Sequence, residues 1–187
     1  CASPRGHGDA TGCLANAIEK YLAPDAYREL TMKWLIREAT YSDVNDIARL
    51  VKDLTDEIIE RTTAKHFNVN IEQITKLLKD FLESGKYSVL VALQDNKIVG
   101  FANLCPSYAL YAEGNFGIVQ EFYVVPEHRS SGLGAALIKE CAILAKNKGW
   151  KRLELCTPPI PEFDRTIKFY QTNGFEITGG RKMKRTI

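Results

Sequence analysis

A glycine-containing segment carries the clearest chemical signal in this sequence. The run Val124–Ala135 follows an apolar, strand-like stretch and leads directly into an amphipathic helix, with Gly132 and Gly134 at the junction. The first N–H groups of a helix lack intrahelical acceptors, and the helix dipole adds partial positive charge at that end. Glycine leaves these groups uncovered and permits a positive φ angle that turns them inward. The segment therefore predicts a site for a pyrophosphate, held mainly by the main chain.

The composition excludes several classes of protein. The chain has 187 residues, 45% of them apolar and 26% charged, which is enough for one globular domain with its own core. A formal net charge of +2 is too small for a typical nucleic-acid-binding protein. No apolar stretch approaches the ~20 residues that span a bilayer, and the N-terminus lacks the pattern of a signal peptide. We therefore expect a cytoplasmic protein that binds neither nucleic acid nor membranes.

The cysteines indicate neither a disulfide framework nor a metal site. Five cysteines are scattered along the chain, and no two of them stand in a Cys-x-x-Cys pair. This odd number and wide spacing are typical of a reducing compartment. We expect no bound metal.

Residues 1–31 differ in composition from the rest of the chain. The segment Cys1–Gly12 is rich in Gly, Ala, Ser, Pro and Asp, whereas Met32 stands directly before a strand-like stretch. We therefore expect an N-terminal extension of uncertain origin over residues 1–31 and one functional domain over residues 32–187.

Short strand and helix signals alternate through this domain. Helices are predicted at 44–58, 71–83 and 132–148, with a short one ending at Gly174. Strands are predicted at 34–38, 87–93, 98–104, 118–125 and 151–156, and from Phe175 onward. Antiparallel hairpins occupy the middle of this order, and a helical crossover joins the fourth strand to the fifth. We therefore expect an α/β fold, more exactly a mixed α+β sheet, with helices on both faces.

Local signals mark the starts of two helices. Ser42 with Asp43 is a plausible start for the first helix, and Asn70 with Gln73 resembles a capping box for the second.

Three motifs in this order resemble the GNAT superfamily of N-acetyltransferases. The loop Arg129–Gly134 is similar to the family's pyrophosphate-binding loop, and Glu121–Glu127 is similar to its fourth strand. The segment Phe169–Phe175 is similar to its C-terminal Phe-Tyr-x-x-x-Gly-Phe signature. The resemblance covers residues 32–187 and implies a GNAT fold whose central strands splay apart near Val124 and Cys156. A dinucleotide-binding turn is the rival interpretation, but its third glycine would fall on Leu137.

The resemblance implies acetyl-coenzyme A (acetyl-CoA) as the acyl donor. Its pantetheine would lie beside the fourth strand and its pyrophosphate on the N–H groups of the loop. The implied donor-binding residues are Phe122, Tyr123, Val124, Arg129, Ser130, Ser131, Gly132, Leu133, Gly134 and Ala135.

The implied reaction is direct attack of an amine on the thioester carbonyl. Tyr170 is the candidate acid that protonates the leaving sulfur, and a main-chain N–H near Phe122 could bind the oxyanion. Glu121 is the candidate base. The segment Ile36–Thr40 and the acidic first helix, however, also resemble the spermidine/spermine N-acetyltransferases, in which the family's Glu aligns with Gln120. Because strand neighbours face opposite ways, Glu121 would then point away from the acyl group. A water chain from Tyr108 or Tyr111 is the alternative route for the proton.

The acceptor is not determined by the sequence. Asp53, Asp56, Glu57 and Glu60 could attract a cationic amine or form a solvated helix face. The basic C-terminal residues Arg181, Lys182, Lys184 and Arg185 could favour an acidic acceptor or the nucleotide phosphates, or simply charge an edge strand.

Two further interpretations stay open. Tyr108 and Tyr111 are candidates for the acceptor wall or for a homodimer contact. At the position where the family usually has Asn, this chain has Phe163, which would remove one pantetheine contact and leave Asp164 as a helix cap. A non-catalytic acyl-CoA-binding sensor or assembly module is therefore the alternative to an enzyme.

Overall fold

The computed structural model describes residues 33–62, 69–112, 114–159, 161–179 and 185. The chain divides into two compact units, residues 1–35 and residues 36–187. The predicted extension 1–31 lies outside the described residues. The fold below is that of the second unit, with its first strand beginning at Leu35, the last residue of the first unit.

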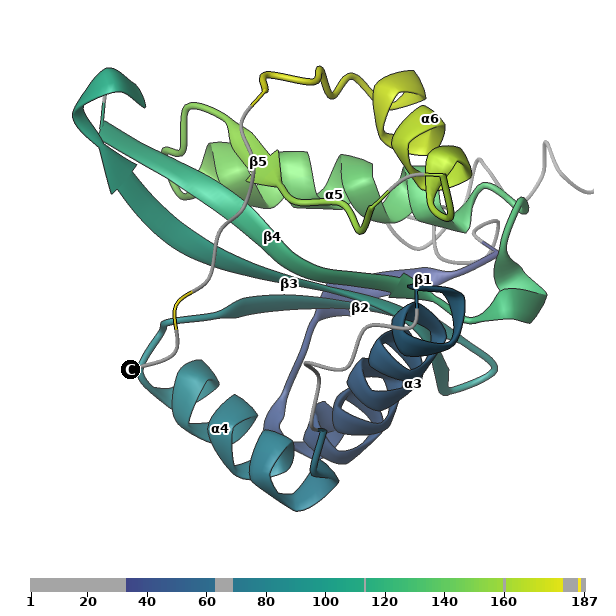
Figure 1. Ribbon diagram of the computed structural model, residues 1–187. Coiled ribbons are helices and arrows are strands. Elements are labelled where there is room, and N and C mark those ends of the chain that lie inside the picture. The colour runs from purple at the N-terminus through teal and green to yellow at the C-terminus, as the bar shows by residue number, and fades with distance from the viewer. Residues whose placement is uncertain (1–32, 63–68, 113, 160, 180–184, 186–187) are drawn as a thin grey trace, which may run out of the picture. The chain divides into compact units, whose positions relative to one another are not determined.

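Five strands form one mixed sheet in the order β1-β2-β3-β4-β5. Their bounds are β1 Leu35–Glu38, β2 Ser88–Gln94, β3 Lys97–Ala109, β4 Gly114–Val124 and β5 Leu153–Leu155. The β2–β3 and β3–β4 pairs are antiparallel, and β4 and β5 are parallel, joined by a helical crossover (Figure 1). The predicted mixed sheet is confirmed.

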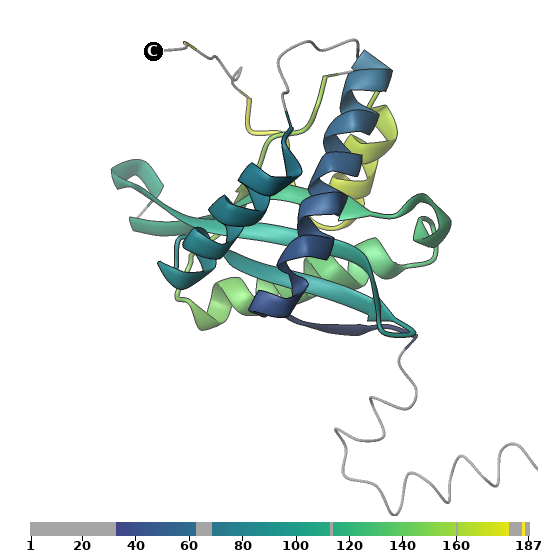
Figure 2. The ribbon, with the colours of Figure 1, turned by 90° about the horizontal axis from the view of Figure 1, so that it is seen from below.

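Helices cover both faces of the sheet, as predicted. Their bounds are α3 Val44–Thr62, α4 Ile71–Glu83, α5 Leu133–Asn147 and α6 Asp164–Thr172, with short 3-10 turns η1 Tyr41–Asp43, η2 Leu110–Ala112 and η3 Pro126–His128. Helices α3 and α4 lie across one face, and α5 and α6 lie on the other (Figures 1 and 2).

Strand alternation divides the core into two clusters. Val89 and Phe101 pack with α3 and α4, whereas their neighbours Leu90 and Ala102 pack with α5. Apolar runs such as those of β2 and β3 are expected where a strand is covered on both faces.

Strand β4 parts from β5 halfway along its length. The two strands pair only between Gly117–Val119 and Leu153–Leu155, so the stretch Gln120–Val124 has no pairing with β5. We call Gln120–Val124 the open edge of β4. The predicted splay of the central strands is confirmed, and the pairing ends earlier than Val124.

A β-bulge in β4 lies where this open edge begins. Leu104 pairs with Val119 and Asn103 pairs with Glu121, so Gln120 is the extra residue. Val119 and Phe122 consequently pack on the same face, that of α5, although they are three positions apart. Beyond the bulge, each side chain of β4 therefore lies on the face opposite to the one that simple alternation from the first half of the strand would give.

Three local predictions differ from the structure. A 3-10 turn over Tyr41–Asp43 precedes α3, and its N-cap is Thr40, which forms a capping box with Asp43, so Ser42 lies within the turn and is not its cap. Asp164 is not a cap but the first residue of α6, where it pairs with Lys168. Residues 175–179 form no strand, so the predicted last strand is wrong over this stretch, and 180–184 lie outside the described residues.

Candidate functional site

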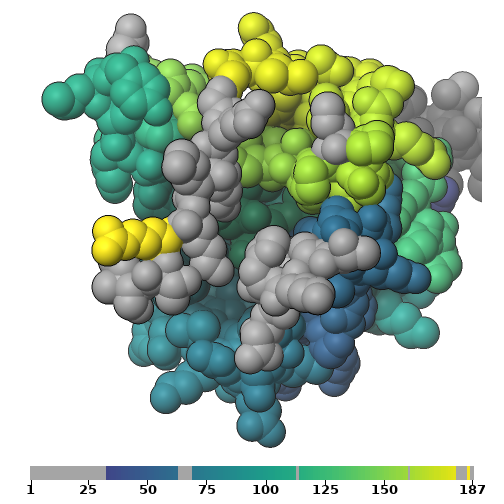
Figure 3. Space-filling view, viewed as in Figure 1, coloured from purple at the N-terminus to yellow at the C-terminus, as the bar shows by residue number. Residues whose placement is uncertain are grey.

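The open edge of β4 presents main-chain groups away from β3. The N–H of Val125 donates to the carbonyl oxygen of Val99 at 3.0 Å, and the register continues with Tyr123 opposite Phe101. In an antiparallel ladder, such hydrogen-bonded pairs alternate with pairs whose N–H and C=O groups point outward. Phe122 and Val124 are therefore the residues that point to the open side. Figure 3 shows the surface hollowed above β4, between α6 and the helices α3 and α4.

The loop after β4 has the backbone of an anion-binding site. Gly132 has a φ of 95°, as predicted for one of the two glycines, and Ser130 has a φ of 58°. Such left-handed residues turn successive N–H groups to one side. Within the described chain, none of the N–H groups of residues 130–135 donates to a backbone carbonyl. Ser131 closes the loop by donating its hydroxyl to the carbonyl of His128 at 2.5 Å.

Arg129 holds the loop rather than facing its N–H groups. Its Nε donates to the carbonyl oxygen of Val124 at 2.8 Å, and its two terminal nitrogens contact both carboxylate oxygens of Glu57 at 3.0 and 2.6 Å. Its guanidinium also lies over the ring of Tyr123, 5.3 Å from the centroid. Burial opposes ionisation of Glu57, but Arg129 and Arg61 outweigh it and lower the pKa of this carboxyl group.

A second arginine extends this arrangement to the segment before α6. Arg61 pairs with Glu57 at 3.0 Å and donates to the carbonyl of Glu162. Its guanidinium lies 4.0 Å from the ring centroid of the buried Phe163. We call Arg129, Glu57, Arg61 and Phe163 the strap, because it joins α3 to the segments before α5 and α6. The sequence offers no signal for it, since the partners are up to 102 positions apart.

Gly134 has a packing role in addition to the one predicted. A Cβ atom there would lie 3.0 and 3.1 Å from two ring atoms of Phe169. The glycine therefore lets α6 approach α5 closely, in addition to leaving the loop uncovered. Leu133 contributes only its N–H to the loop, because its side chain is fully buried.

Tyr170 lies in an aromatic cluster on the α5 face. Its ring centroid is 6.0 Å from that of Phe122, 5.2 Å from that of Phe169 and 5.5 Å from that of Phe175. Burial raises the pKa of the Tyr170 phenol well above its usual range. The phenol therefore stays protonated, and Phe122 places it beside the open edge.

Glu121 lies at the same edge but faces the other layer. Its Oε2 accepts a hydrogen bond from Nδ2 of Asn103 at 3.1 Å. The bulge at Gln120 accounts for this orientation, which simple alternation along β4 did not allow us to predict. Gln120 itself is exposed and donates to the sulfur of Cys105 at 3.2 Å. Glu121 and Tyr170 thus approach the open edge from opposite faces of the sheet.

A small cavity lies between Glu121 and the helices α3 and α4. Its volume is about 130 Å³. It is lined by Val51, Ile74, Leu77, Leu78, Phe81, Tyr87, Asn103 and Glu121. We call it the α3–α4 cavity. The sequence did not single out Asn103, because a lone polar residue within an apolar strand has no motif to mark it.

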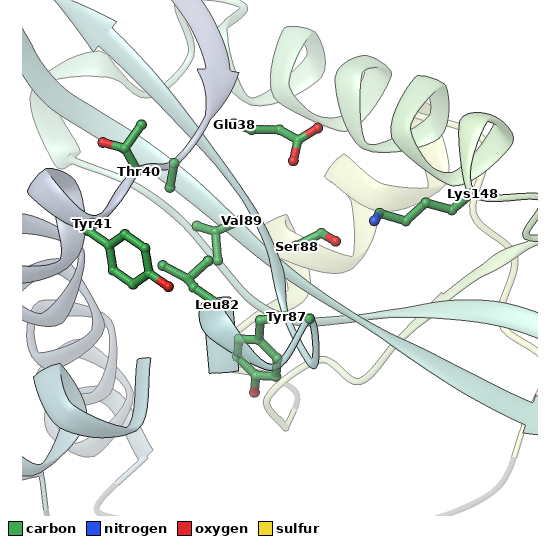
Figure 4. Close-up of a pocket in the computed structure, with 10 residues that line it drawn as sticks. Glu38, Thr40, Tyr41, Leu82, Tyr87, Ser88, Val89 and Lys148 are labelled. Carbon is green, nitrogen blue, oxygen red and sulfur yellow. The ribbon is translucent and has the colours of Figure 1, made fainter. Parts of the chain in front are cut away.

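A larger hollow of about 310 Å³ lies elsewhere (Figure 4). Glu38, Ser88 and Lys148 border it, and Lys148 follows the C-terminal end of α5. The loop before α5 is at the opposite end of that 15-residue helix, about 22 Å away. This hollow is therefore distinct from that loop.

Two groups of candidate acceptor residues lie away from the α3–α4 cavity. Tyr108 pairs with Asn115 at the tip of the β3–β4 hairpin, roughly 23 Å of strand before Phe122, and Tyr111 follows in the connecting turn. Of the acidic residues of α3, Asp56 pairs with Lys52 and Glu57 belongs to the strap, while Asp53 and Glu60 are exposed. The solvated-face interpretation therefore fits α3 better than an acidic acceptor surface. Of the basic C-terminal residues, Arg181, Lys182 and Lys184 lie outside the described residues.

The described part of the chain holds no cluster of three or more His, Cys, Asp or Glu residues placed to bind a metal ion. Among the helices that the structure describes, none is both long and apolar enough to cross a membrane.

Comparison with known proteins agrees with this geometry. The family model described as "Acetyltransferase (GNAT) domain" matches residues 85–177. A Bos taurus protein named thialysine N-epsilon-acetyltransferase is 30% identical over 129 residues, which cover 65% of this chain and 72% of that protein. A Bacillus subtilis (strain 168) protein named uncharacterized N-acetyltransferase YhfO is 26% identical over 145 residues, which cover 78% of this chain and 91% of that protein.

The solved structures show the same fold. Aminoglycoside N-acetyltransferase AAC(6')-Iy in complex with CoA superposes with a TM-score of 0.68 at 20% sequence identity, covering 82% of this chain and 94% of that one. A ribosomal-protein-alanine N-acetyltransferase from Brucella melitensis biovar Abortus 2308 has a TM-score of 0.62 at 22% sequence identity, covering 82% of this chain and 99% of that one. The sequence relatives, the family model and the splayed β4–β5 pair together show that this chain belongs to the GNAT family of acetyltransferases and is an acyltransferase enzyme.

Proposed function

We propose that this protein transfers an acetyl group from acetyl-CoA to a primary amine of a small molecule or peptide. The observation that carries the proposal is the continuity of the open edge with the anion-binding loop. Main-chain groups of Phe122 and Val124 point away from β3, and the uncovered N–H groups of residues 130–135 follow directly. The pantetheine would add to the edge as an extra strand, and the pyrophosphate would bind at the start of α5.

The donor contacts are then mostly main-chain contacts. The carbonyl of Val124 already accepts from Arg129, so its N–H is the group left for the pantetheine, and the N–H of Phe122 would bind the oxyanion. Of the predicted donor-binding residues, Arg129 and Tyr123 would act indirectly, by fixing the loop and the edge.

Glu121 and Tyr170 would share the proton transfers. The amine nitrogen attacks the thioester carbon, its proton passes to Glu121 on the α3–α4 side, and the carbon–sulfur bond breaks. Tyr170, on the α5 side, protonates the leaving thiolate. Their placement on opposite faces of the sheet supports this division, because the amine nitrogen and the sulfur are different substituents of the tetrahedral carbon, and each needs its own proton-transfer group.

The proposal is tested by titrating acetyl-CoA and then measuring thiol release over an amine panel. Ala135 is exposed in the first turn of α5, so Ala135→Glu should leave the helix stable, since a carboxylate suits a helix N-terminus. The same charge would repel the pyrophosphate and weaken acetyl-CoA binding by about tenfold or more. Ala135→Gln is the neutral control.

Two results would count against the proposal. Equal affinity of Ala135→Glu and Ala135→Gln for acetyl-CoA would remove the pyrophosphate from this loop. Binding of acetyl-CoA without thiol release from any amine would favour the non-catalytic sensor instead.

We also propose a cytoplasmic setting, in keeping with the free thiols of Cys105, Cys141 and Cys156. The homodimer stays a prediction, which sedimentation velocity at two protein concentrations checks.

A further inference from the structure

The α3–α4 cavity combines apolar walls with a polar base. Five apolar side chains of α3 and α4 form the walls, and Tyr87, Asn103 and Glu121 come from the sheet side. Its volume of about 130 Å³ is close to the ~150 Å³ of an apolar cavity that accepts one benzene molecule. The cavity is thus large enough for one small ring or a short branched chain.

Asn103 supplies a hydrogen-bond acceptor that lacks a donor. The residue is only 2% exposed, and its Nδ2 is committed to Glu121 at 3.1 Å. Its buried Oδ1 has no hydrogen-bond partner within the described structure. A buried amide oxygen without a donor destabilises the protein, and Asn103 lines the α3–α4 cavity, so a ligand bound there is one source of the missing donor.

The charge of the cavity indicates how many cationic groups it can hold. Glu121 is the one ionisable carboxylate among the described residues that line it. Tyr87 is neutral, because burial and then the nearby Glu121 raise the pKa of its phenol far above the usual range. A second cation on the ligand would have to lie against Leu78 and Phe81, where nothing compensates the loss of its hydration.

We propose that the α3–α4 cavity binds the acceptor as a primary amine with a single positive charge, carried on a small apolar group. The ammonium donates hydrogen bonds to Oδ1 of Asn103 and to the carboxylate of Glu121, and the apolar group contacts the walls. This inference rests on the proposed acetyl transfer and adds the substrate class.

The same geometry disfavours several other amines. Polyamines and aminoglycosides carry further cations that the apolar walls cannot pair. Free amino acids carry a carboxylate that Glu121 would repel across this short distance. Asn103 is therefore a specificity-determining residue, since its amide oxygen selects an ammonium donor that arrives beside Glu121.

The experiment measures kcat/KM by thiol release with five amines and saturating acetyl-CoA. Benzylamine and 3-methylbutylamine are the apolar probes, and spermidine, lysine and kanamycin are the multiply charged ones. We expect both apolar amines to exceed all three others by at least about tenfold, the ratio that corresponds to one uncompensated charge contact.

Two variants test the walls and the amide. Leu77 is 43% exposed, so Leu77→Glu should fold while placing a second carboxylate at the cavity. We expect it to lower kcat/KM for benzylamine and to raise it for spermidine, each by about tenfold. Lys79→Gln makes the same change of net charge on an exposed position of α4 outside the cavity and should alter neither value. Asn103→Leu should raise KM for benzylamine by tenfold or more, roughly the value of a hydrogen bond to a charged group, without changing the affinity for acetyl-CoA.

The outcomes separate this inference from the proposed function. Higher efficiency with spermidine, lysine or kanamycin than with the apolar amines overturns the inference and leaves acetyl transfer in place. A preference for apolar amines that Leu77→Glu does not change also overturns it, even where Asn103→Leu does not fold. Thiol release from no amine at all, with acetyl-CoA bound, overturns both.

Discussion

At the scale of single residues, Asp43 links stability to pH. Arg37 donates hydrogen bonds of 2.7 and 2.9 Å to the Asp43 carboxylate, and the main-chain N–H and the hydroxyl of Thr40 donate two further hydrogen bonds. Together they outweigh the cost of burial and lower the pKa of Asp43 from 3.8 to about 2. A carboxyl group whose pKa is lower in the folded state stabilises the protein above its ordinary pKa. This stabilisation is lost as the pH falls from about 4 to about 2.

We therefore predict that Asp43→Asn lowers the free energy of unfolding by roughly 2 kcal/mol at pH 7. The difference from wild type should shrink as the pH approaches 2. Urea denaturation at several pH values measures it. Asp46→Asn is the control, because the exposed pair of Asp46 with Arg49 should contribute less than about 1 kcal/mol. A pH-independent difference would contradict the assignment.

Tyr170 permits a second prediction at this scale. Tyr170→Phe keeps the ring contacts with Phe122, Phe169 and Phe175 and removes only the hydroxyl group. We expect kcat to fall by about a hundredfold or more while the affinity for acetyl-CoA stays the same. Because burial raises the pKa of this phenol, wild-type turnover should not decline through its deprotonation up to about pH 10. An unchanged kcat would remove Tyr170 from the mechanism.

At the scale of elements, the short stretch over which β4 and β5 pair depends on Gly117. A Cβ atom at Gly117 would lie 2.2 Å from a ring atom of Trp150, and the N–H of Gly117 donates to the carbonyl of Arg152 at 3.0 Å. The ring of Trp150 therefore packs directly over the backbone of β4 where the two strands pair. The splay begins just beyond this point, at Gln120.

Gly117→Ala should consequently lower the free energy of unfolding by about 1–3 kcal/mol, because the ring of Trp150 must move. Thermal denaturation of a double-mutant cycle with Trp150→Leu tests the cause. If the contact is responsible, the effects of the two substitutions should couple by about 0.5–3 kcal/mol. Gly117→Ala should then lower the free energy of unfolding less in the Trp150→Leu variant than in the wild-type protein. Additive effects would show that Gly117 serves another purpose.

At the scale of the whole domain, the strap connects the two layers around the open edge. Glu57 of α3 contacts Arg129 before α5, and Arg61 contacts the segment before α6. Helix α3 and the segment before α5 are thereby held together by one carboxylate. The strap explains why Arg129 faces α3 and not the loop N–H groups.

We predict that Glu57→Gln weakens acetyl-CoA binding by about tenfold, although Glu57 lies outside the proposed donor contacts. The loss of one charge leaves two guanidinium groups without their shared partner, and the loop becomes less ordered. Isothermal titration measures the affinity. Asp56→Asn, which removes a neighbouring exposed ion pair with Lys52, should leave the affinity unchanged. Equal effects of the two substitutions would contradict a role for the strap.

The sequence by itself determined most of the helices and strands and the backbone of the loop before α5. The periodicity of α4 and its Asn70 cap predicted a helix over about 71–83, and the observed helix spans Ile71–Glu83. Gly132 has the left-handed conformation expected for one of the two glycines at the start of α5. These features depend on neighbours within a few residues, so local propensity and capping suffice to predict them.

Tertiary structure alone decided how the side chains meet at the site. The bulge at Gln120 turned Glu121 toward α3 and α4, Phe169 accounted for Gly134, and Glu57 engaged Arg129 from 72 positions away. The α3–α4 cavity beside Asn103 likewise arises from two helices packed against a sheet. Each of these features is a contact between segments distant in the chain, and no local pattern records which distant residues will pack together.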